Sequence, residues 1–299
     1  MSSADVAVRV FRQLENEDLR ILHIVEAAMS KRAFVPKEQI KKYAKVPMDR
    51  VDFTLSRLNK LGLIYSMHGA YVGYTLNYAG YDCLAINAFV KAGLIDAFGQ
   101  TLGVGKEADV YDALTQVDMR VAVKFHRLGR ISFRQTRRKR GYAAEHAGWL
   151  FQSRLAAERE FHALKLVYAQ GVAVPEPLSQ NRHAIVMGMI EGAELAKWRE
   201  FPAPEKVLKE ILRNVKKAYV KARVIHADLS EYNIILKPDM RVLIIDWPQY
   251  VVVGHPNAQE LLMRDVKNVL KYFSRRYGLK VKNREVYAYV TGKGRALAF

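Results

Sequence analysis

Three oxygen-bearing side chains, Asp228, Asn233 and Asp246, lie in short polar segments beside two apolar runs, Ile234 to Leu236 and Val242 to Ile245. Each run has the length and composition of a buried strand, and the Pro-Asp pair between them predicts a turn. A hairpin of these strands would hold the three side chains at one end. Mg²⁺ prefers oxygen ligands and usually takes one or two carboxylates together with substrate phosphates. Asn233 and Asp246 suit such an ion, which leaves Asp228 for a nucleophile or a proton.

A glycine-rich turn and a lysine upstream of these residues could hold phosphates. Gly103 and Gly105 lie between two strand-like runs, where backbone N–H groups can approach a phosphate closely. The turn is not a Walker A loop, because no glycine-lysine-serine or glycine-lysine-threonine ending follows it, and it opens no helix as a dinucleotide fingerprint does. Lys124 ends the apolar strand that begins at Val121, so its ammonium group must find a partner or a charged ligand.

The elements that must position these side chains follow from the apolar periodicity of the chain. An amphipathic helix is predicted from Arg154 to Tyr168. Its inward face would comprise Leu155, Phe161, Leu164 and Val167. Glu158 and Glu160 lie on this helix, and we expect one of them to reach Lys124 while the other is exposed. The other elements predicted in this half of the chain are an apolar strand over 184–190 and long amphipathic helices over 204–223 and 260–277.

The first 80 residues predict short helices followed by a small ribbon. Apolar residues recur at helical spacing from Leu19 to Met29 and from Met48 to Leu61, and Pro36 opens a short helix between them. Two strand-like pieces follow, over 63–66 and 71–76. This order predicts a winged helix whose third helix lies on nucleic acid. The cations that lie off the apolar stripe of that helix are Arg50, Arg57 and Lys60. The alternative is a three-helix bundle used only for protein contacts.

The charge balance indicates a polyanionic partner. The formal net charge is +18, from 48 basic against 30 acidic residues, which favours nucleic acid before a membrane surface. Nine lysines and arginines and no acid occur between Met119 and Ala144. Because this segment has few large apolar groups, we expect a flexible loop that contacts RNA or phosphate. Its outward cluster would be Arg137, Arg138, Lys139 and Arg140.

Other features narrow the class of protein. No apolar run approaches the roughly 18 to 20 residues of a membrane span, and the first residues do not resemble a secretion signal, so we expect a cytoplasmic protein with no membrane partner. Cys83 is the only cysteine, which excludes an internal disulfide and a thiolate zinc cluster.

Several motifs occur in the order and spacing of the protein-kinase fold. They are Gly-x-Gly-x-x-Ala-x-Val from Gly103, Val-Ala-Val-Lys124, His-x-Asp-x-x-x-x-Asn from His226, and Ile-Ile-Asp246. The residues in and around these motifs resemble those of the RIO family of atypical kinases. The segments that carry this resemblance are Gly105-Lys-Glu, Lys124-Phe-His, His226-Ala-Asp-Leu-Ser-Glu-Tyr-Asn, Ile245-Asp-Trp-Pro-Gln and Arg264-Asp-Val-Lys-Asn. The winged helix with Tyr78-Ala-Gly-Tyr-Asp82 resembles the second RIO subfamily in its archaeal form, and the likeness covers nearly the whole chain.

The resemblance implies an α+β fold, with an N-terminal winged helix followed by a bilobal protein-kinase-like domain. The implied parts are a winged helix over 1–80, a helical linker over 81–95, a kinase N-lobe over 96–190 that includes a flexible basic loop over 125–145, and a C-lobe over 191–299. It also implies a monomer that uses ATP with Mg²⁺, or Mn²⁺ in its place. The implied role is that of a switch, with autophosphorylation, in maturation of the small ribosomal subunit and its rRNA.

Carried onto this sequence, the resemblance assigns roles to single residues. Asp228 would be catalytic, Asn233 and Asp246 would bind metal, and Lys124 would hold the α- and β-phosphates and pair with Glu160. Further nucleotide contacts would come from Gly103, Gly105, Lys106, Glu107, Ser132, Arg134, Met187, Gly188 and Ile190, the last three at the adenine. The resemblance also casts Asp265 as the helix residue that braces the catalytic loop, with an ordinary surface acid as the alternative.

The chain departs from ordinary kinases in ways that the RIO pattern shares. Ala108 replaces the third glycine, Trp247-Pro248 follows the metal aspartate, and only about a dozen residues precede the helix predicted from Glu260. A segment that short leaves little room for a peptide platform, which weakens the case for phosphorylation of other proteins.

Two other functions remain open: a winged-helix DNA-binding regulator whose kinase-like domain senses nucleotide, and a pseudokinase scaffold. Retention of Lys124 with the polar set of the hairpin argues against the scaffold.

Overall fold

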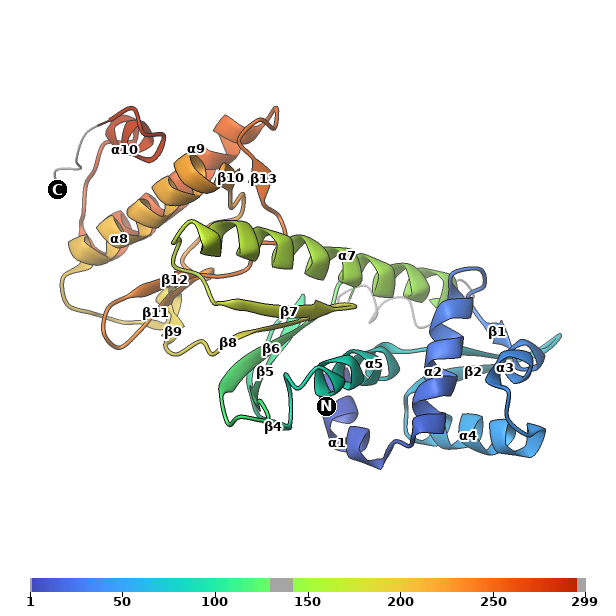
Figure 1. The fold of residues 1–299 in the computed structure, drawn as a ribbon. Helices are drawn as coiled ribbons and strands as arrows, with labels where there is room; N and C mark the ends of the chain where they lie inside the picture. The colour runs from blue at the N-terminus through green and yellow to red at the C-terminus, as the bar shows by residue number, and fades with distance from the viewer. Residues whose placement is uncertain (1, 130–141, 295–299) are drawn as a thin grey trace. The chain divides into compact units, whose positions relative to one another are not determined.

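The computed structural model of the chain describes residues 2–129 and 142–294 (Figure 1). It contains two compact units, residues 1–157 with 179–186, and residues 158–178 with 187–299. No helix among the described residues is long and apolar enough to cross a membrane.

The N-terminal residues form the winged helix that the sequence predicts. Its helices are α1 (Ser3–Val10), α2 (Asn16–Met29), α3 (Lys37–Ala44) and α4 (Met48–Lys60), with a single 3₁₀ turn, η1 (Phe11–Gln13). Its strands β1 (Val35–Pro36), β2 (Ile64–His68) and β3 (Val72–Leu76) pair in the order β1-β3-β2, so the ribbon gains one short strand that periodicity did not indicate. Pro36 precedes the first residue of α3 instead of opening the helix.

Helix α5 (Tyr78–Lys91) is buried around nearly its whole circumference, with both α1 and α2 packed against it. The side chain of Asn77 caps its first turn by accepting a hydrogen bond from the N–H of Gly80 at 3.0 Å. Any side chain at position 80 would collide with the carbonyl of Leu63, so glycine is required there for the close approach of helix and ribbon. Cys83 lies inside this helix and is fully buried, as expected for a packing residue.

A five-stranded sheet follows α5. Its strands are β4 (Ala97–Val104), β5 (Ala108–Leu114), β6 (Arg120–His126), β7 (Pro177–Asn181) and β8 (Ala184–Gly188), in the order β4-β5-β6-β8-β7. The antiparallel β4–β5 pair confirms the strand, glycine-rich turn, strand arrangement. Every residue of β6 after Arg120 is buried, which explains why the strand reads as a continuous apolar run into Lys124.

Two predictions about the helix α7 (Tyr142–Ala169) and the loop before it need correction. Leu155 is 36% exposed and does not face inward; the buried positions from Ser153 to Val167 recur at helical spacing on another stripe. The basic loop is also shorter than 125–145, because β6 continues to His126, Arg127 is buried, and α7 begins at Tyr142. Residues 130–141 of that loop lie outside the described residues.

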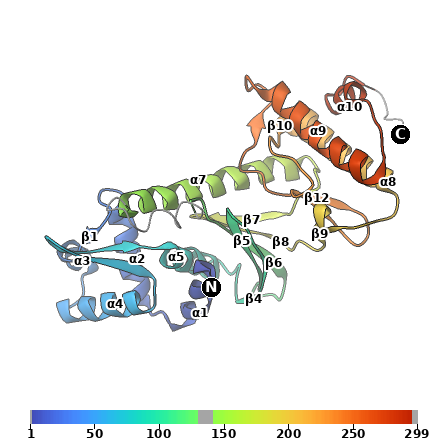
Figure 2. The ribbon, with the colours of Figure 1, turned by 180° about the vertical axis from the view of Figure 1, so that it is seen from behind.

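The second unit is mostly helical (Figure 2). Its helices are α8 (Pro204–Lys217), continued by a π-helical turn η3 (Ala218–Ala222), then α9 (Ala258–Tyr277) and α10 (Asn283–Val290), with a 3₁₀ turn η2 (Leu195–Lys197). Its strands are β9 (Ala193–Glu194), β10 (Val224–Ile225), β11 (Ile234–Leu236), β12 (Val242–Ile244) and β13 (Val251–Val252). Strands β12, β11 and β9 form one sheet and β10 pairs with β13.

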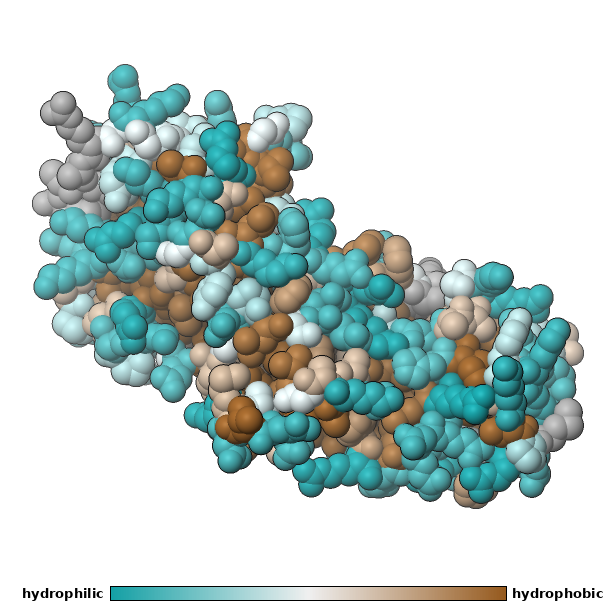
Figure 3. Space-filling model, in the orientation of Figure 1, coloured by the Kyte–Doolittle hydropathy of each residue, from teal (hydrophilic) through white to brown (hydrophobic). Residues whose placement is uncertain are grey.

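The core of this unit lies between the long helices and the small sheets. Apolar faces of α8 and α9 meet there with Ile234, Leu236, Val242 and Ile244 of the hairpin. Figure 3 shows hydrophilic side chains over most of the visible face of the molecule, with apolar surface between them. Because the strands of the hairpin are buried in this core, the core also fixes the positions of the polar residues at their ends.

Candidate active site

The loop between β10 and β11 carries Asp228, and side chains of α9 hold its backbone. The two carboxylate oxygens of Asp265 accept hydrogen bonds from the N–H groups of Ala227 at 2.8 Å and Leu229 at 3.0 Å. Arg264 donates to the carbonyl of Ala227, which has a left-handed φ of 64° that costs a non-glycine residue energy. These contacts fix the residues on both sides of Asp228, whose own carboxylate is exposed.

Asp265 therefore has the bracing role that the resemblance implied. It is 1% exposed, and burial raises the pKa of its carboxyl to about 6, while its two backbone hydrogen bonds act in the opposite direction. Two further contacts from α9 to this loop were not predicted from the sequence. Arg264 donates to the carbonyl of Ala227, and Asn268 donates to the carbonyl of Leu229 at 3.2 Å. A signal was present, because positions 264, 265 and 268 share one side of a helix.

His226 ties the loop to the end of the hairpin. Its Nε2–H donates to the carbonyl of Ile245 at 2.9 Å, and its Nδ1 accepts from the N–H of Asp228 at 3.3 Å, an arrangement that requires the neutral imidazole. Burial lowers the pKa of His226 and so favours that form. The ring lies 4.6 Å from the ring of Trp247, which is 1% exposed.

The β11–β12 hairpin brings Asn233 and Asp246 to the same end, as the sequence predicts. Ile234 pairs with Ile244, and the N–H of Ile245 donates to the carbonyl of Asn233 at 3.0 Å. The side-chain amide of Asn233 donates to the carbonyl of Asp228 at 2.8 Å, which leaves its oxygen for another partner. Asp246 adopts a left-handed φ of 66°, and strained residues of this kind cluster at functional sites.

This donor set fits a magnesium ion that is shared with a nucleotide. Among residues 2–129 and 142–294, no group of three or more histidine, cysteine, aspartate or glutamate side chains could hold a metal ion by itself. Mg²⁺ commonly binds through one or two protein oxygens and completes its shell with phosphates and water. One carboxylate from Asp246 and one amide oxygen from Asn233 supply that number.

The phosphate-binding residues predicted upstream lie on β4, β5 and β6. Gly103 lies near the end of β4, and Gly105, Lys106 and Glu107 lie in the turn to β5; all four are exposed. The N–H of Gly105 closes the turn on the carbonyl of Ala108 at 2.8 Å. Lys124 on β6 lies opposite Val110 of β5 and is only 8% exposed. Its ammonium group is therefore largely removed from water, as expected for a lysine that binds a charged partner.

Of the two glutamates on α7, one of which was expected to be exposed, Glu160 is 2% exposed and Glu158 is half-buried. The pairing of Glu160 with Lys124 stays a prediction. The neighbouring residue Arg159 donates to the carbonyl of Pro248 at 3.0 Å and to that of Tyr250 at 3.1 Å. Arg159 thus holds the short segment after Asp246, a contact that sequence reasoning missed.

The predicted adenine contacts require one refinement. Met187 is 3% exposed at the end of β8, and the N–H of Gly188 donates to the carbonyl of Glu176 at 2.8 Å. That donor is engaged within the chain, so an adenine ring would have to use backbone groups beyond it, toward Ile190.

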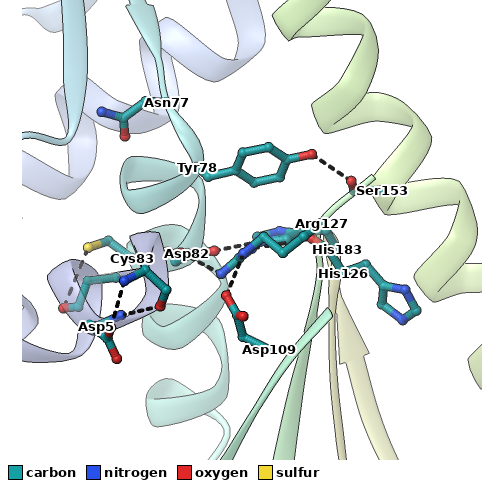
Figure 4. A network of polar contacts seen from close by, with 12 residues as sticks. Asp5, Asn77, Tyr78, Asp82, Cys83, Asp109, His126, Arg127, Ser153 and His183 are labelled. Atoms are coloured by element: carbon teal, nitrogen blue, oxygen red, sulfur yellow. Dashed lines mark hydrogen bonds and ion pairs between the residues drawn. The ribbon is translucent and has the colours of Figure 1, made fainter. Parts of the chain in front are cut away.

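A buried polar network connects α5 with β5, with the end of β6 and with the turn between β7 and β8 (Figure 4). Arg127, 2% exposed, donates to Asp82 at 2.9 Å and to Asp109 at 3.1 Å. His183 donates through Nε2–H to the second oxygen of Asp82 at 2.6 Å. The hydroxyl of Tyr78 donates to the carbonyl of Leu128 at 2.8 Å. Since breaking a buried ion pair commonly costs about 3 to 5 kcal/mol, this network fixes the end of β6 firmly to the linker helix.

The network predicts a pH dependence of stability. Burial lowers the pKa of His183 from 6.5 to about 4, against the opposing effect of Asp82. The folded state therefore resists protonation of His183, so this contribution to stability is complete above pH 6.5 and is lost as the pH falls toward 4. The shift corresponds to about 3 kcal/mol in the free energy of unfolding.

Urea unfolding between pH 4.5 and 7.5 should show this loss in the parent and a flatter profile in His183→Gln, which keeps an N–H donor for Asp82 but cannot titrate. His68→Gln, which changes an exposed histidine, serves as control. Parallel profiles for the parent and His183→Gln would contradict the assignment.

The structure accounts differently for the predicted nucleic-acid contacts. Arg50 forms an ion pair with Glu17 at 2.6 Å, and Arg57 forms one with Glu15 at 3.0 Å, whereas Lys60 is exposed. Exposed ion pairs are weak, commonly about 0.2 to 1 kcal/mol, so phosphate could still displace them. Ser132, Arg134, Arg137, Arg138, Lys139 and Arg140 lie outside the described residues.

Comparison with known proteins supports the family resemblance of the sequence. The family model described as "RIO domain" matches residues 109–286, and the model described as "Rio2, N-terminal" matches residues 11–92. The RIO-type serine/threonine-protein kinase Rio2 of Methanocaldococcus jannaschii is 43% identical over 86% of this chain and 98% of its own length. The serine/threonine-protein kinase rio2 of Schizosaccharomyces pombe is 37% identical over 91% of this chain and 80% of its own length.

The similarity extends to the three-dimensional structure of a solved relative. The Rio2 kinase of Chaetomium thermophilum, described as an ADP/Mg²⁺-phosphoaspartate complex, superposes with a TM-score of 0.82 at 32% identity, over 96% of this chain and 88% of that one. The RIO model alone matches more than half of the chain, and the winged helix has its own match. This chain therefore belongs to the RIO family of serine/threonine protein kinases, in its Rio2 branch.

Proposed function

We propose that this kinase binds ATP with Mg²⁺, or with Mn²⁺ in its place, and turns it over at the end of the β11–β12 hairpin. The observation that carries the proposal is the placement of Asn233 and Asp246 beside a loop whose backbone is fixed around Asp228. The bound metal would neutralise charge on the phosphates. The ADP and Mg²⁺ named for the C. thermophilum relative support this choice of ligands.

The residues of the chain divide the work of such a reaction. Asn233 and Asp246 would hold the metal, Lys124 would hold the α- and β-phosphates with Glu160 as its partner, and the glycine-rich turn would cover the phosphates. Asp228 would orient or deprotonate the acceptor, or accept the phosphoryl group itself. Since His226 and Asp265 fix its backbone from two sides, little reorganisation is needed at that carboxylate.

The segment after the metal aspartate favours transfer within the chain or to water. Only residues 247–257 separate Asp246 from α9, and Arg159 fixes the backbone at Pro248 and Tyr250. A segment this short and fixed leaves little room for a peptide substrate. We therefore infer a switch in which ATP turnover, with autophosphorylation, changes the state of the protein. The phosphoaspartate named for the C. thermophilum relative supports an acceptor at the site itself.

A single-turnover experiment with γ-³²P-labelled ATP and Mg²⁺ tests this proposal. We expect Mg²⁺-dependent binding, release of inorganic phosphate and labelling of the chain. Treatment of the denatured protein with hydroxylamine would separate an acyl phosphate, which it cleaves, from a serine phosphate, which it leaves intact. Absence of Mg²⁺-dependent nucleotide binding would overturn the assignment of the site.

The partner we propose is the maturing small ribosomal subunit, bound through its rRNA. The net charge of +18 and the winged helix support a nucleic-acid partner, and the nine lysines and arginines without an acid between Met119 and Ala144 favour contacts with phosphate. A DNA-binding regulator that senses nucleotide is the competing function. Sequencing the nucleic acid that copurifies with the protein distinguishes the two, because genomic fragments in place of small-subunit rRNA would favour the regulator.

The salt dependence of RNA binding predicts how the basic loop takes part. Each phosphate contact should add about 0.7 to 0.9 to the salt slope of log affinity, so replacing Arg137, Arg138, Lys139 and Arg140 by glutamine should lower the slope by roughly three units. ATP affinity should change little, since Ser132 and Arg134, which we assign to the nucleotide, are kept. Fluorescence titration of small-subunit rRNA from 50 to 300 mM salt measures the slope.

A matched control replaces four exposed cations of the second unit, Lys267, Lys271, Arg275 and Lys280, by glutamine. An unchanged slope in the loop variant would move the RNA site to α4, near Arg50 and Arg57.

A further inference from the structure

A groove on the first unit has no part in the site described above. It encloses about 660 Å³ and is bounded by α2, α3 and α5. Its floor is apolar, formed by Leu19, Ile24, Ala27 and Ala28 of α2, with the ring of Tyr43 on α3 at one side. We call it the α2 groove. None of the lining residues belongs to α4, the helix assigned to nucleic acid.

The α2 groove is surrounded by positive charge without matching acids. Arg20, Lys31 and Lys91 line it and form no ion pair with the described part of the chain, and no aspartate or glutamate is among the lining residues. Two acidic residues of α2 are already paired with other cations, Glu26 with Arg182 at 2.6 Å and Glu17 with Arg50 at 2.6 Å. The charge around the groove is therefore available to a ligand.

Asn87 of α5 supplies an independent sign of a binding site. This residue lines the groove and is only 7% exposed, yet its side-chain amide makes no hydrogen bond with any described residue. Its polar atoms are not among the fully buried atoms that lack a partner, so the small exposed part of Asn87 includes its amide, which water can reach through the groove. An amide directed to a groove that no chain segment fills is placed to bond to an occupant.

We propose that the α2 groove docks an amphipathic α-helix with acidic flanks from a partner protein. The lining residues of α2 run from Asn16 to Ala28, about 18 Å at 1.5 Å per residue, which matches about three turns of a second helix. Such a helix would place apolar side chains at i, i+3, i+4 and i+7 on the alanine-rich floor. Its glutamates or aspartates would face Arg20, Lys31 and Lys91. An RNA strand would satisfy these cations but would leave the aliphatic floor without a partner.

Fluorescence anisotropy with model peptides tests the proposal on the full-length protein. The probe is a fluorescein-labelled 16-residue helix with leucine at i, i+3, i+4 and i+7 and glutamate at the flanking positions, compared with the same peptide carrying lysine in place of glutamate. We expect the acidic peptide to bind at least about tenfold more tightly, because charge complementarity sets the choice of partner.

Two variants locate the binding site. Lys31→Glu/Lys91→Glu reverses charge at the edge of the groove, and Ala27→Trp fills its floor without changing charge. Each should weaken binding of the acidic peptide about tenfold. The control Arg12→Glu/Lys42→Glu makes the same charge change at exposed positions that do not line the groove, and it should alter the affinity less than twofold. Thermal unfolding followed by circular dichroism checks that all three variants fold.

Three outcomes would overturn the proposal. Equal binding of the acidic and basic peptides would remove the role of charge. Equal weakening by the groove and control reversals would show non-specific attraction. Binding of a 16-nucleotide single-stranded RNA that falls in parallel in both groove variants would make the α2 groove a nucleic-acid surface. None of these outcomes depends on ATP turnover, so a failure here is distinguishable from a failure of the proposed function.

Discussion

Asp246→Asn is expected to lower Mg²⁺-dependent ATP turnover by about 10² to 10⁴ while leaving the fold intact. Asparagine keeps the size of the side chain and one oxygen but removes the negative charge opposite the metal. Because a metal that bridges the phosphates contributes both to nucleotide binding and to the transition state, Mg²⁺-nucleotide affinity should fall as well. Single-turnover phosphate release and calorimetric titration of ADP with and without Mg²⁺ measure the two effects separately.

The hairpin itself offers a matched control. Asp239 lies in the turn at its far end, where its carboxylate accepts from the N–H of Arg241 at 3.0 Å. Asp239→Asn makes the same chemical change on the same two strands and should leave turnover within about twofold, as for most surface substitutions. Equal turnover in Asp246→Asn and the parent would remove Asp246 from the metal site.

The hairpin was predictable because its signals are local. Two short apolar runs, a Pro-Asp turn and polar residues at both ends lie within two dozen residues, and the structure pairs them as expected. The turn signal at Asp239 is equally local, since its carboxylate binds the N–H group of Arg241 two residues on. The bracing role of Asp265 came from the family resemblance, since nothing in the helix pattern distinguishes a buried acid from an exposed one.

The errors arose where tertiary contacts decide. Leu155 has the spacing of an inward-facing residue, but the buried stripe of α7 passes through Ser153 and Ala157 because of what packs against the helix. The predicted bounds of the basic loop, 125–145, were too wide, because the sequence does not distinguish Arg127 from a solvated cation. Its partners Asp82 and Asp109 are far away in sequence, and only the folded chain reveals that both are buried beside it.

Asp228→Ala, in contrast to Asp246→Asn, is expected to spare ATP binding and to lower turnover by about 10² to 10⁴. The backbone around Asp228 is held from α9 by Asp265 and from the hairpin by Asn233, so the loop should keep its conformation when the carboxylate is removed. A group that orients or deprotonates the acceptor, or that receives the phosphoryl group, acts mainly in the transition state. In Asp228→Ala the single-turnover rate should therefore fall while the nucleotide affinity is kept, whereas both should fall in Asp246→Asn.

Glu231→Ala removes a half-buried carboxylate from the same loop and controls for the charge change. ATP turnover at the parental rate in Asp228→Ala would show that another group performs this step.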